Sequence, residues 1–218
     1  MSYYKIENLE EYFKHYKKSI REPKKFWDRI ASENFTWYQE WDNVIDFNMA
    51  EAEIKWFTNA KVNITKNCID RHLAKRGEKT AIIFEPNDPK EEALHITYNE
   101  LYERVSKMAN VLREQGVKKG DRVCIYLPMI PELAVSVLAC ARIGAIHSVI
   151  FAGFSSTAVA TRINDSECKM VITSDGGYRG NKTIDLKEIV DEALEKCNSV
   201  EKVLVAKRIH SNINMKEG

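Results

Sequence analysis

The residues most able to bind a ligand lie between positions 174 and 182, which read SDGGYRGNK. Three glycines let the backbone approach a ligand closely. Arg179 and Lys182 add two positive charges three residues apart. Flexible backbone beside a guanidinium and an ammonium group favours an anion site, above all one for a phosphate. The segment matches neither G-x-x-x-x-G-K-[ST] nor G-x-G-x-x-G, so a solvent-exposed turn remains the alternative.

A second candidate segment is Phe151-Ala152-Gly153-Phe154, in which two small residues separate two aromatic rings. The gap could admit a flat or thin ligand, but a packed turn is the favoured prediction. His147 lies shortly before this segment, in an apolar run. We predict it to be a buried core histidine rather than a catalytic base. No serine–histidine–aspartate order and no metal-ligand spacing stands out.

Both candidate segments follow short apolar runs, at 146–150 and 170–173, and both precede helix-like stretches. Further strands are expected at 80–85, 122–127 and 202–205, separated by helices near 97–115, 131–143, 155–165 and 186–196. This alternation predicts an α/β fold with a parallel-dominated sheet flanked by helices. Ligands of such sheets bind at the carboxyl ends of the strands, where both candidate segments are expected. The residues after 205 form a polar tail with little to bury.

Composition excludes several classes of protein. The chain has 218 residues and a formal net charge of +1, which gives no support for nucleic acid binding. No apolar run approaches the roughly 20 residues that a membrane helix needs. The five cysteines are scattered and form no C-x-x-C pair, so neither zinc nor disulfides are expected and a cytoplasmic protein fits best. Nothing in the sequence assigns an oligomeric state.

Residues 1–78 differ from the rest of the chain, because they hold all four tryptophans and contain no glycine before Gly77. Apolar residues recur at helical spacing from Leu9 to Tyr16, which predicts a mainly helical, Trp-rich extension. Asn63 is expected to cap a helix that runs to Leu73. The aromatic residues are expected to pack against another domain, with an aromatic ligand site as the alternative. Residues 79–218 form the predicted α/β subdomain.

The sequence resembles the AMP-forming acetyl-CoA synthetases of the adenylate-forming enzyme superfamily. The resemblance rests on ordered segments that read KWF (55–57), NCIDRHL (67–73), GDRV (120–123), YLPMIPE (126–132), ARIGAIHSV (141–149) with FAGF (151–154), and RGNK (179–182). It covers most of residues 25–205. The fold it implies is the first part of the large domain of these enzymes, preceded by their N-terminal extension.

The resemblance implies a two-step ligase that uses acetate, ATP, CoA and Mg²⁺. Acetate attacks the α-phosphate of ATP, which gives acetyl-adenylate and pyrophosphate, and the CoA thiol then displaces AMP. By resemblance, Arg179 contacts the adenine or 3′-phosphate of CoA and Lys182 adds charge, while Phe151, Ala152 and Gly153 line the same channel. Ala152 and Asn181 replace glycines that the family often has, and the methyl group of Ala152 narrows a tight site.

The resemblance also implies that several family motifs lie beyond Gly218: the ATP phosphate loop, the acetate pocket, the ribose-binding aspartate and the C-terminal domain with its catalytic lysine. The chain is therefore expected to be inactive alone and to contain no catalytic residue and no metal ligand. Without the acetate pocket, propionate or another short-chain acid remains an alternative substrate. A non-catalytic CoA- or nucleotide-binding module and an interaction protein are further alternatives.

Overall fold

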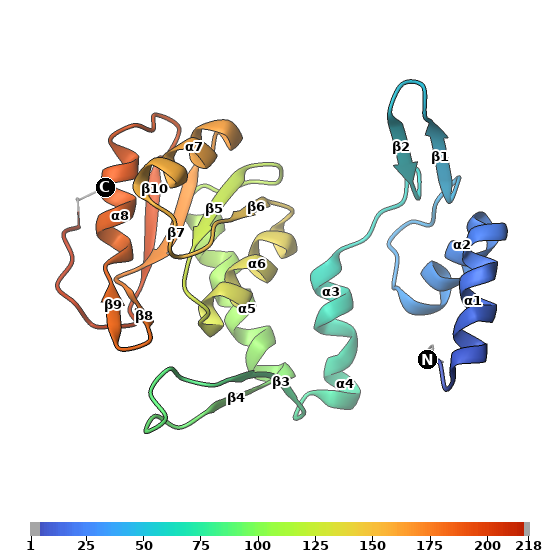
Figure 1. The fold of residues 1–218 in the computed structure, drawn as a ribbon, viewed down its shortest axis with the longest axis horizontal. Coiled ribbons are helices and arrows are strands. Elements are labelled where there is room, and N and C mark those ends of the chain that lie inside the picture. The colour runs from blue at the N-terminus through green and yellow to red at the C-terminus, as the bar shows by residue number, and fades with distance from the viewer. Residues whose placement is uncertain (1–4, 216–218) are drawn as a thin grey trace. The chain divides into compact units, whose positions relative to one another are not determined.

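A computed structural model describes residues 5–215 of the chain and divides it into two compact units. Unit 1 ends at Asn67 and unit 2 begins at Cys68 (Figure 1). The subdomain boundary expected at 78/79 from the sequence stays a prediction.

Within residues 5–67, unit 1 contains two complete helices, one β-hairpin and all but the last residue of a third helix. Its complete elements are α1 (Leu9–Arg21), α2 (Pro23–Asn34), β1 (Ile45–Asn48) and β2 (Glu53–Trp56). Asn8 caps α1, because its side-chain Oδ1 accepts a hydrogen bond of 2.8 Å from the backbone N–H of Glu11. Pro23 suits the first turn of α2, where its missing N–H costs nothing. The helices agree with the sequence-based prediction, whereas the antiparallel hairpin was not anticipated.

The aromatic residues of unit 1 pack largely against each other. The ring centroids of Trp37 and Trp41 are 5.0 Å apart, and those of Trp41 and Phe57 are also 5.0 Å apart. The indole N–H of Trp37 donates to the carbonyl oxygen of Ala31, and that of Trp41 donates to Asp28. These contacts hold Trp37 and Trp41 within unit 1.

A four-stranded parallel sheet forms the centre of unit 2, in the strand order β10-β7-β5-β6. Its strands are β5 (Arg122–Tyr126), β6 (Ile146–Val149), β7 (Met170–Ser174) and β10 (Lys202–Ala206). The prediction that 146–150 and 170–173 lie in one sheet is therefore confirmed. Strand β7 is buried along its whole length, as expected of a central parallel strand.

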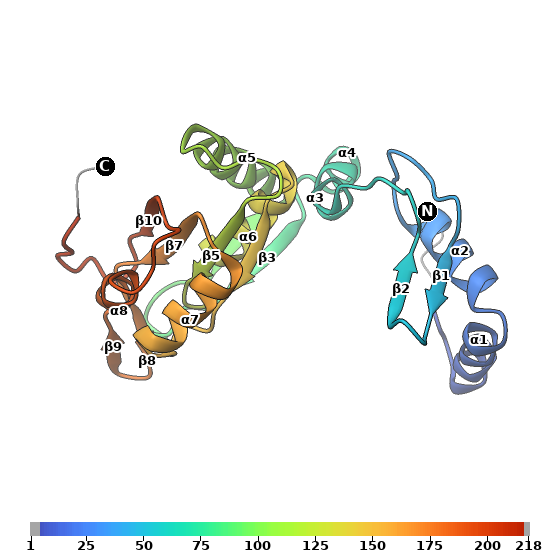
Figure 2. The ribbon, with the colours of Figure 1, turned by 90° about the horizontal axis from the view of Figure 1, so that it is seen from above.

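Four helices cover the two faces of this sheet. They are α5 (Tyr98–Glu114), α6 (Pro131–Ile143), α7 (Ser156–Ser166) and α8 (Leu186–Leu194). Thr97 and Glu100 form the predicted capping box of α5, and Gly144, with a φ of +77°, ends α6. Alternate sheet residues point into separate cores: Ile125 packs with α5 and α6, and Tyr126 with α7 and α8. Figure 2 shows α7 and α8 on the side of the sheet opposite α5.

Shorter elements lie outside the sheet, and the first of them crosses from unit 1 into unit 2 at Cys68. They are α3 (Ile64–Cys68), the 3₁₀ turn η1 (Asp70–His72), α4 (Leu73–Arg76), the antiparallel pair β3 (Thr80–Phe84) and β4 (Leu94–Thr97), and the hairpin β8 (Gly177–Arg179) and β9 (Lys182–Ile184). The helix predicted to run from 63 to 73 is thus broken after Cys68. Two hydrogen bonds from Arg142 on α6 hold Asp70 of η1, at 3.2 and 2.7 Å.

Two predictions about burial were wrong. His147 is exposed rather than in the core, because β6 is the edge strand of the sheet. The segment after β10 is not a free polar tail, since Arg208 and Ile209 are partly buried. The contacts of this segment belong to the candidate site.

Candidate functional site

The Gly-rich segment forms a β-hairpin at the end of β7 rather than an open loop. In the hairpin Tyr178 pairs with Thr183, and Arg179 pairs with Lys182 across a two-residue turn. Gly180 takes the first turn position with a φ of +59°, a value that type II′ hairpin turns require and that glycine adopts without strain. Arg179 and Lys182 thereby stand opposite each other next to the tip of the hairpin.

Arg179 and Lys182 are both exposed. Among the residues that the structure describes, neither forms an ion pair or a hydrogen bond through its side chain. Directly opposite strand residues have Cβ atoms about 4.5–5.5 Å apart, so both side chains leave the same face of the hairpin from neighbouring positions. Two unneutralised cations at this spacing suit an anion with several oxygens, such as a phosphate group.

The tip and the base of the hairpin are held by residues that sequence reasoning did not select. The side-chain amide of Asn87, in the β3–β4 loop, donates a 2.9 Å hydrogen bond to the carbonyl oxygen of Gly180. At the base, the Oδ1 of Asp175 accepts hydrogen bonds from the backbone N–H groups of Arg208 and Ile209. The one sequence signal for Asp175 as a site residue was its position directly after a buried strand. The partners of Asp175 and Asn87 are too distant along the chain to be found from sequence.

The other candidate segment forms a turn at the end of β6. The backbone N–H of Phe154 donates to the carbonyl oxygen of Phe151 at 3.2 Å, and the two rings meet edge-on at 6.0 Å. This contact between the two rings agrees with the packed turn that the sequence favours. The ring of Phe151 is still 67% exposed. The guanidinium of Arg162 lies 4.7 Å from the centroid of the Phe154 ring and places a cation beside this turn.

Both segments lie at the carboxyl edge of the sheet, with β5 between their parent strands. The connection from β5 runs to its neighbour β6, whereas the connection from β7 runs in the opposite direction, to β10. The topological switch point of the sheet therefore lies between β5 and β7, at this carboxyl edge. The Tyr126 hydroxyl donates to the carbonyl oxygen of Phe154 at 2.7 Å, and Thr173 donates to the Tyr126 carbonyl at 3.0 Å. No hydrogen bond, ion pair or ring contact joins the two segments directly within residues 5–215.

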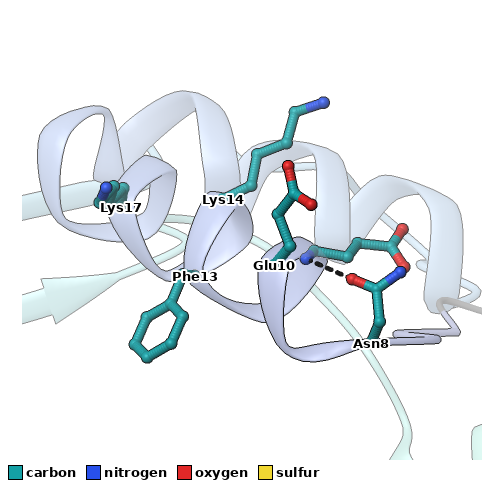
Figure 3. A pocket seen from close by; sticks show the side chains of 6 residues that line it. Asn8, Glu10, Phe13, Lys14 and Lys17 are labelled. Carbon is teal, nitrogen blue, oxygen red and sulfur yellow. Dashed lines mark hydrogen bonds between the residues drawn. The ribbon is translucent and has the colours of Figure 1, made fainter.

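A hollow of about 340 Å³ lies beside the hairpin and is lined by Asn87, Asp88, Pro89, Glu91, Tyr178, Gly180 and Asn181. A second hollow of about 210 Å³ shares Asn87 and Tyr178 and also reaches Arg208. A larger hollow of about 610 Å³ runs along α1 in unit 1 and contains none of the predicted site residues. Figure 3 shows that Phe13 and Lys14 of this third hollow point to different sides of α1, which is typical of an open helix surface.

The described residues offer little for catalysis. They contain no group of three or more His, Cys, Asp or Glu side chains that could hold a metal ion. Burial raises the pKa of both Cys124 and Cys140 to about 12, and neither thiol is ionised near neutral pH. No helix within residues 5–215 has the length and apolar character needed to cross a membrane.

Comparison with protein families assigns the larger part of the chain. The model described as "AMP-binding enzyme" matches residues 69–216. The chain belongs to the AMP-binding enzyme family. A second model, described as the N-terminus of acetyl-coenzyme A synthetase, matches residues 12–68. The two matches meet next to the boundary between unit 1 and unit 2.

Curated relatives of this AMP-binding enzyme chain are named acetyl-coenzyme A synthetase. The protein of Magnetococcus marinus is 51% identical over 97% of this chain and 33% of its own length. That of Desulfatibacillum aliphaticivorans is 53% identical over 95% of this chain and 32% of its own length. The chain thus spans about a third of the length of the relatives that it matches.

A solved structure confirms the fold. The acetoacetyl-CoA synthetase from Streptomyces lividans superposes with a TM-score of 0.83 at 25% sequence identity, covering 91% of this chain and 30% of that protein. The predicted α/β fold with a parallel sheet, flanking helices and an N-terminal helical part is therefore confirmed.

Proposed function

We propose that this chain forms part of an AMP-forming acetate–CoA ligase and contributes to its CoA site. The identity of about half of the aligned residues to proteins named acetyl-coenzyme A synthetase supports the reaction. The observation that carries the assignment of the site is the exposed pair Arg179 and Lys182, which has no counter-ion within residues 5–215 and stands at the switch-point edge of the sheet.

The reaction proposed for the complete enzyme has two steps. A carboxylate oxygen of acetate attacks the α-phosphorus of ATP, and pyrophosphate leaves with the electron pair of the broken P–O bond. The thiol sulfur of CoA then attacks the carbonyl carbon of acetyl-adenylate, AMP leaves, and the thiol proton is released. The ATP, acetate and magnesium sites are assigned to parts of the enzyme outside this chain.

The chemistry of CoA matches the charged and aromatic groups at this edge. Its 3′-phosphate can accept two parallel hydrogen bonds from the Arg179 guanidinium, and the adenine ring can stack on the same planar group. Lys182 supplies a second positive charge at the hairpin tip. Phe151, Ala152 and Gly153 are proposed to line the path of the CoA nucleotide, with the exposed Phe151 ring as its apolar wall.

Replacing Arg179 by alanine in the complete gene product tests this assignment. A lost charge-assisted contact of about 1.5–3 kcal/mol weakens CoA binding by roughly 10- to 150-fold. The apparent KM for CoA should rise by a factor in this range, while the KM values for ATP and acetate change little. Steady-state kinetics with each of the three substrates varied in turn measures the effect.

Two further variants and a control make the test specific. Arg179→Lys should recover only part of the loss, because a point charge replaces a planar fork. Lys182→Ala should act in the same direction with a smaller effect. Arg113→Ala, which removes an exposed arginine near the end of α5, is the matched control and should leave the KM for CoA unchanged. Equal KM values for CoA in wild type and Arg179→Ala would remove Arg179 from the site.

Assays of the 218-residue chain and of the complete gene product together separate the ligase from a stand-alone binding module. It should release no pyrophosphate from ATP in the presence of acetate, because in-line phosphoryl chemistry needs positioned phosphate and metal ligands. The complete gene product should show this release. Turnover by the purified chain that survives repeated purification would contradict the assignment of the ATP site to another part of the enzyme. The substrate profile of the complete enzyme decides between acetate and propionate.

A further inference from the structure

We propose that Asp175 is a positioning residue for the CoA site: it fixes the β8–β9 hairpin, and with it Arg179 and Lys182, through the segment that follows β10. This segment, residues 207–210, is called the strap. The expected change in the KM for CoA rests on the proposed function. The expected change in hydrogen exchange of the hairpin does not.

Asp175 gathers three separate parts of the chain around one carboxylate. Its Oδ1 accepts hydrogen bonds from the backbone N–H groups of Gly176 at 2.8 Å, Arg208 at 2.7 Å and Ile209 at 3.1 Å. Its own backbone N–H donates to the carbonyl oxygen of Ala206 at 2.9 Å. The end of β7, the start of the hairpin and the strap are thus joined at a single residue that is only 1% exposed.

The strap in turn packs against the hairpin. The side chain of Arg208 is 19% exposed and its guanidinium lies 5.1 Å from the ring of Tyr178, the residue next to Arg179. The same guanidinium lies 5.6 Å from the Phe84 ring and pairs with Glu91 at 3.3 Å. Arg208 therefore lies between the hairpin and the β3–β4 pair, while Asp175 binds its backbone N–H.

Close packing at the base of the hairpin allows little adjustment. A Cβ atom added to Gly176 would collide with the Ile209 side chain and would lie 2.7 Å from the Ile184 carbonyl oxygen. The hydroxyl of Ser174 donates to the carbonyl oxygen of Gly176 at 2.8 Å, and this bond fixes the turn from the other side. The strap, the turn and β9 are in contact here, so a shift of the strap would displace the hairpin.

The charge of Asp175 matters for this role. A carboxylate that accepts several N–H groups forms stronger hydrogen bonds than a neutral amide does. The second oxygen, Oδ2, is buried and has no hydrogen-bond partner within residues 5–215, so the carboxylate is held by Oδ1 alone. In an asparagine variant the shape is kept, the acceptor is weakened, and an amide donor is placed in this unpartnered position.

Asp175→Asn in the complete gene product, followed by hydrogen exchange and kinetics, tests the proposal. Amides of residues 177–184 and 207–210 should exchange about three- to tenfold faster, because a charge-assisted acceptor becomes a neutral one. The KM for CoA should rise by a similar factor, while kcat and the KM for ATP stay within about twofold. A change limited to CoA separates positioning from general loss of stability.

The matched control is Asp121→Asn. Asp121 also lies in a turn, where its Oδ2 accepts the backbone N–H of Lys118 at 2.8 Å, but this turn is at the amino end of β5. The control should leave hairpin exchange and the KM for CoA unchanged. Unchanged exchange in Asp175→Asn, or an equal effect of Asp121→Asn, overturns the proposal.

Further outcomes distinguish this proposal from the proposed function. If Asp175→Asn speeds up hydrogen exchange in the hairpin but leaves the KM for CoA unchanged, the positioning role is overturned. The proposed function is overturned as well only if Arg179→Ala also leaves that KM unchanged. If Asp175→Asn does not fold, Arg208→Gln decides, because it keeps the backbone N–H that Asp175 binds and removes the contacts with Tyr178 and Glu91. It should raise hairpin exchange and the KM for CoA, and no change in either overturns the proposal.

Discussion

The hydroxyl group of Tyr126 donates a hydrogen bond of 2.7 Å to the carbonyl oxygen of Phe154, which lies 28 residues further along the chain. Tyr126 ends β5 and is fully buried. Burial raises the pKa of its hydroxyl, so the group stays a neutral donor throughout the physiological range. The centre of the sheet thereby holds the turn that carries Phe151 and Gly153.

Tyr126→Phe should loosen this turn. The variant keeps the ring in the core and leaves the Phe154 carbonyl without its donor, which costs about 0.5–1.5 kcal/mol. Chemical unfolding of the complete enzyme should begin at lower urea concentration, and the KM for CoA should rise by about 2- to 13-fold if the whole cost appears in binding. Steady-state kinetics measures this rise.

The control for this prediction is Tyr102→Phe, which removes the hydroxyl of a partly exposed tyrosine on α5. Its ring contact with Arg142 does not involve the hydroxyl. This variant should keep the KM for CoA of the wild type. A normal KM in Tyr126→Phe would show that the turn keeps its shape without the bond or does not contact CoA.

The elements of unit 2 were predictable from sequence because they depend on local signals. The capping box at Thr97 and Glu100, Pro131 at the first turn of α6 and Gly144 after its end each act within one or two turns of helix. Apolar runs of four or five residues marked the strands of the parallel sheet. The carboxyl edge followed from their alternation with helices.

The details of the candidate site depend on contacts between distant residues, which periodicity does not reveal. Asp175 and Arg208 are 33 positions apart, and Asn87 and Gly180 are 93 apart. The polar composition after β10 predicted a free tail, but its backbone N–H groups are bound by a buried carboxylate. The segment 174–182 was expected to be a loop because its glycines outweighed the short β-forming stretches on either side of the Gly180 turn.

Gly176→Ala should disturb the hairpin more than its size suggests. The new methyl group would meet the Ile209 side chain and the Ile184 carbonyl oxygen, and backbone cannot move aside as a flexible side chain can. Overpacking of this kind costs about 1–3 kcal/mol. The unfolding midpoint in urea should fall, and hydrogen exchange in residues 177–184 should become faster.

Gly116→Ala is the comparison for this prediction. Gly116 has a φ of +88° and open space around the added methyl group, so the variant tests backbone strain without a clash. It should lower stability by roughly 1–2 kcal/mol, the usual cost of a left-handed conformation for a residue with a side chain. Hairpin exchange should stay normal in this variant, and faster exchange would assign the effect of Gly176→Ala to global stability.

The last prediction concerns acid and the strap. Burial alone would raise the pKa of Asp175, but the N–H groups of Arg208, Ile209 and Gly176 that bind its carboxylate outweigh burial and hold this pKa below its ordinary value. A depressed folded-state pKa contributes stability above the unfolded-state pKa of about 3.9. This contribution is lost as the pH falls from there through the folded-state pKa, because protonation weakens the acceptor.

Hydrogen exchange of the Arg208 and Ile209 amides, corrected for the intrinsic rate at each pH, measures this loss. In the wild type their protection should fall as the pH is lowered from about 5 toward 2. In Asp175→Asn the protection of these two amides should be lower at neutral pH. It should not fall further through loss of a carboxylate charge, because the asparagine side chain does not titrate in that range. The amide of Val117, which donates to the carbonyl oxygen of Leu112 without any carboxylate, reports global opening in the same samples. Parallel pH profiles for Arg208 in the two proteins would show that the charge of Asp175 does not hold the strap.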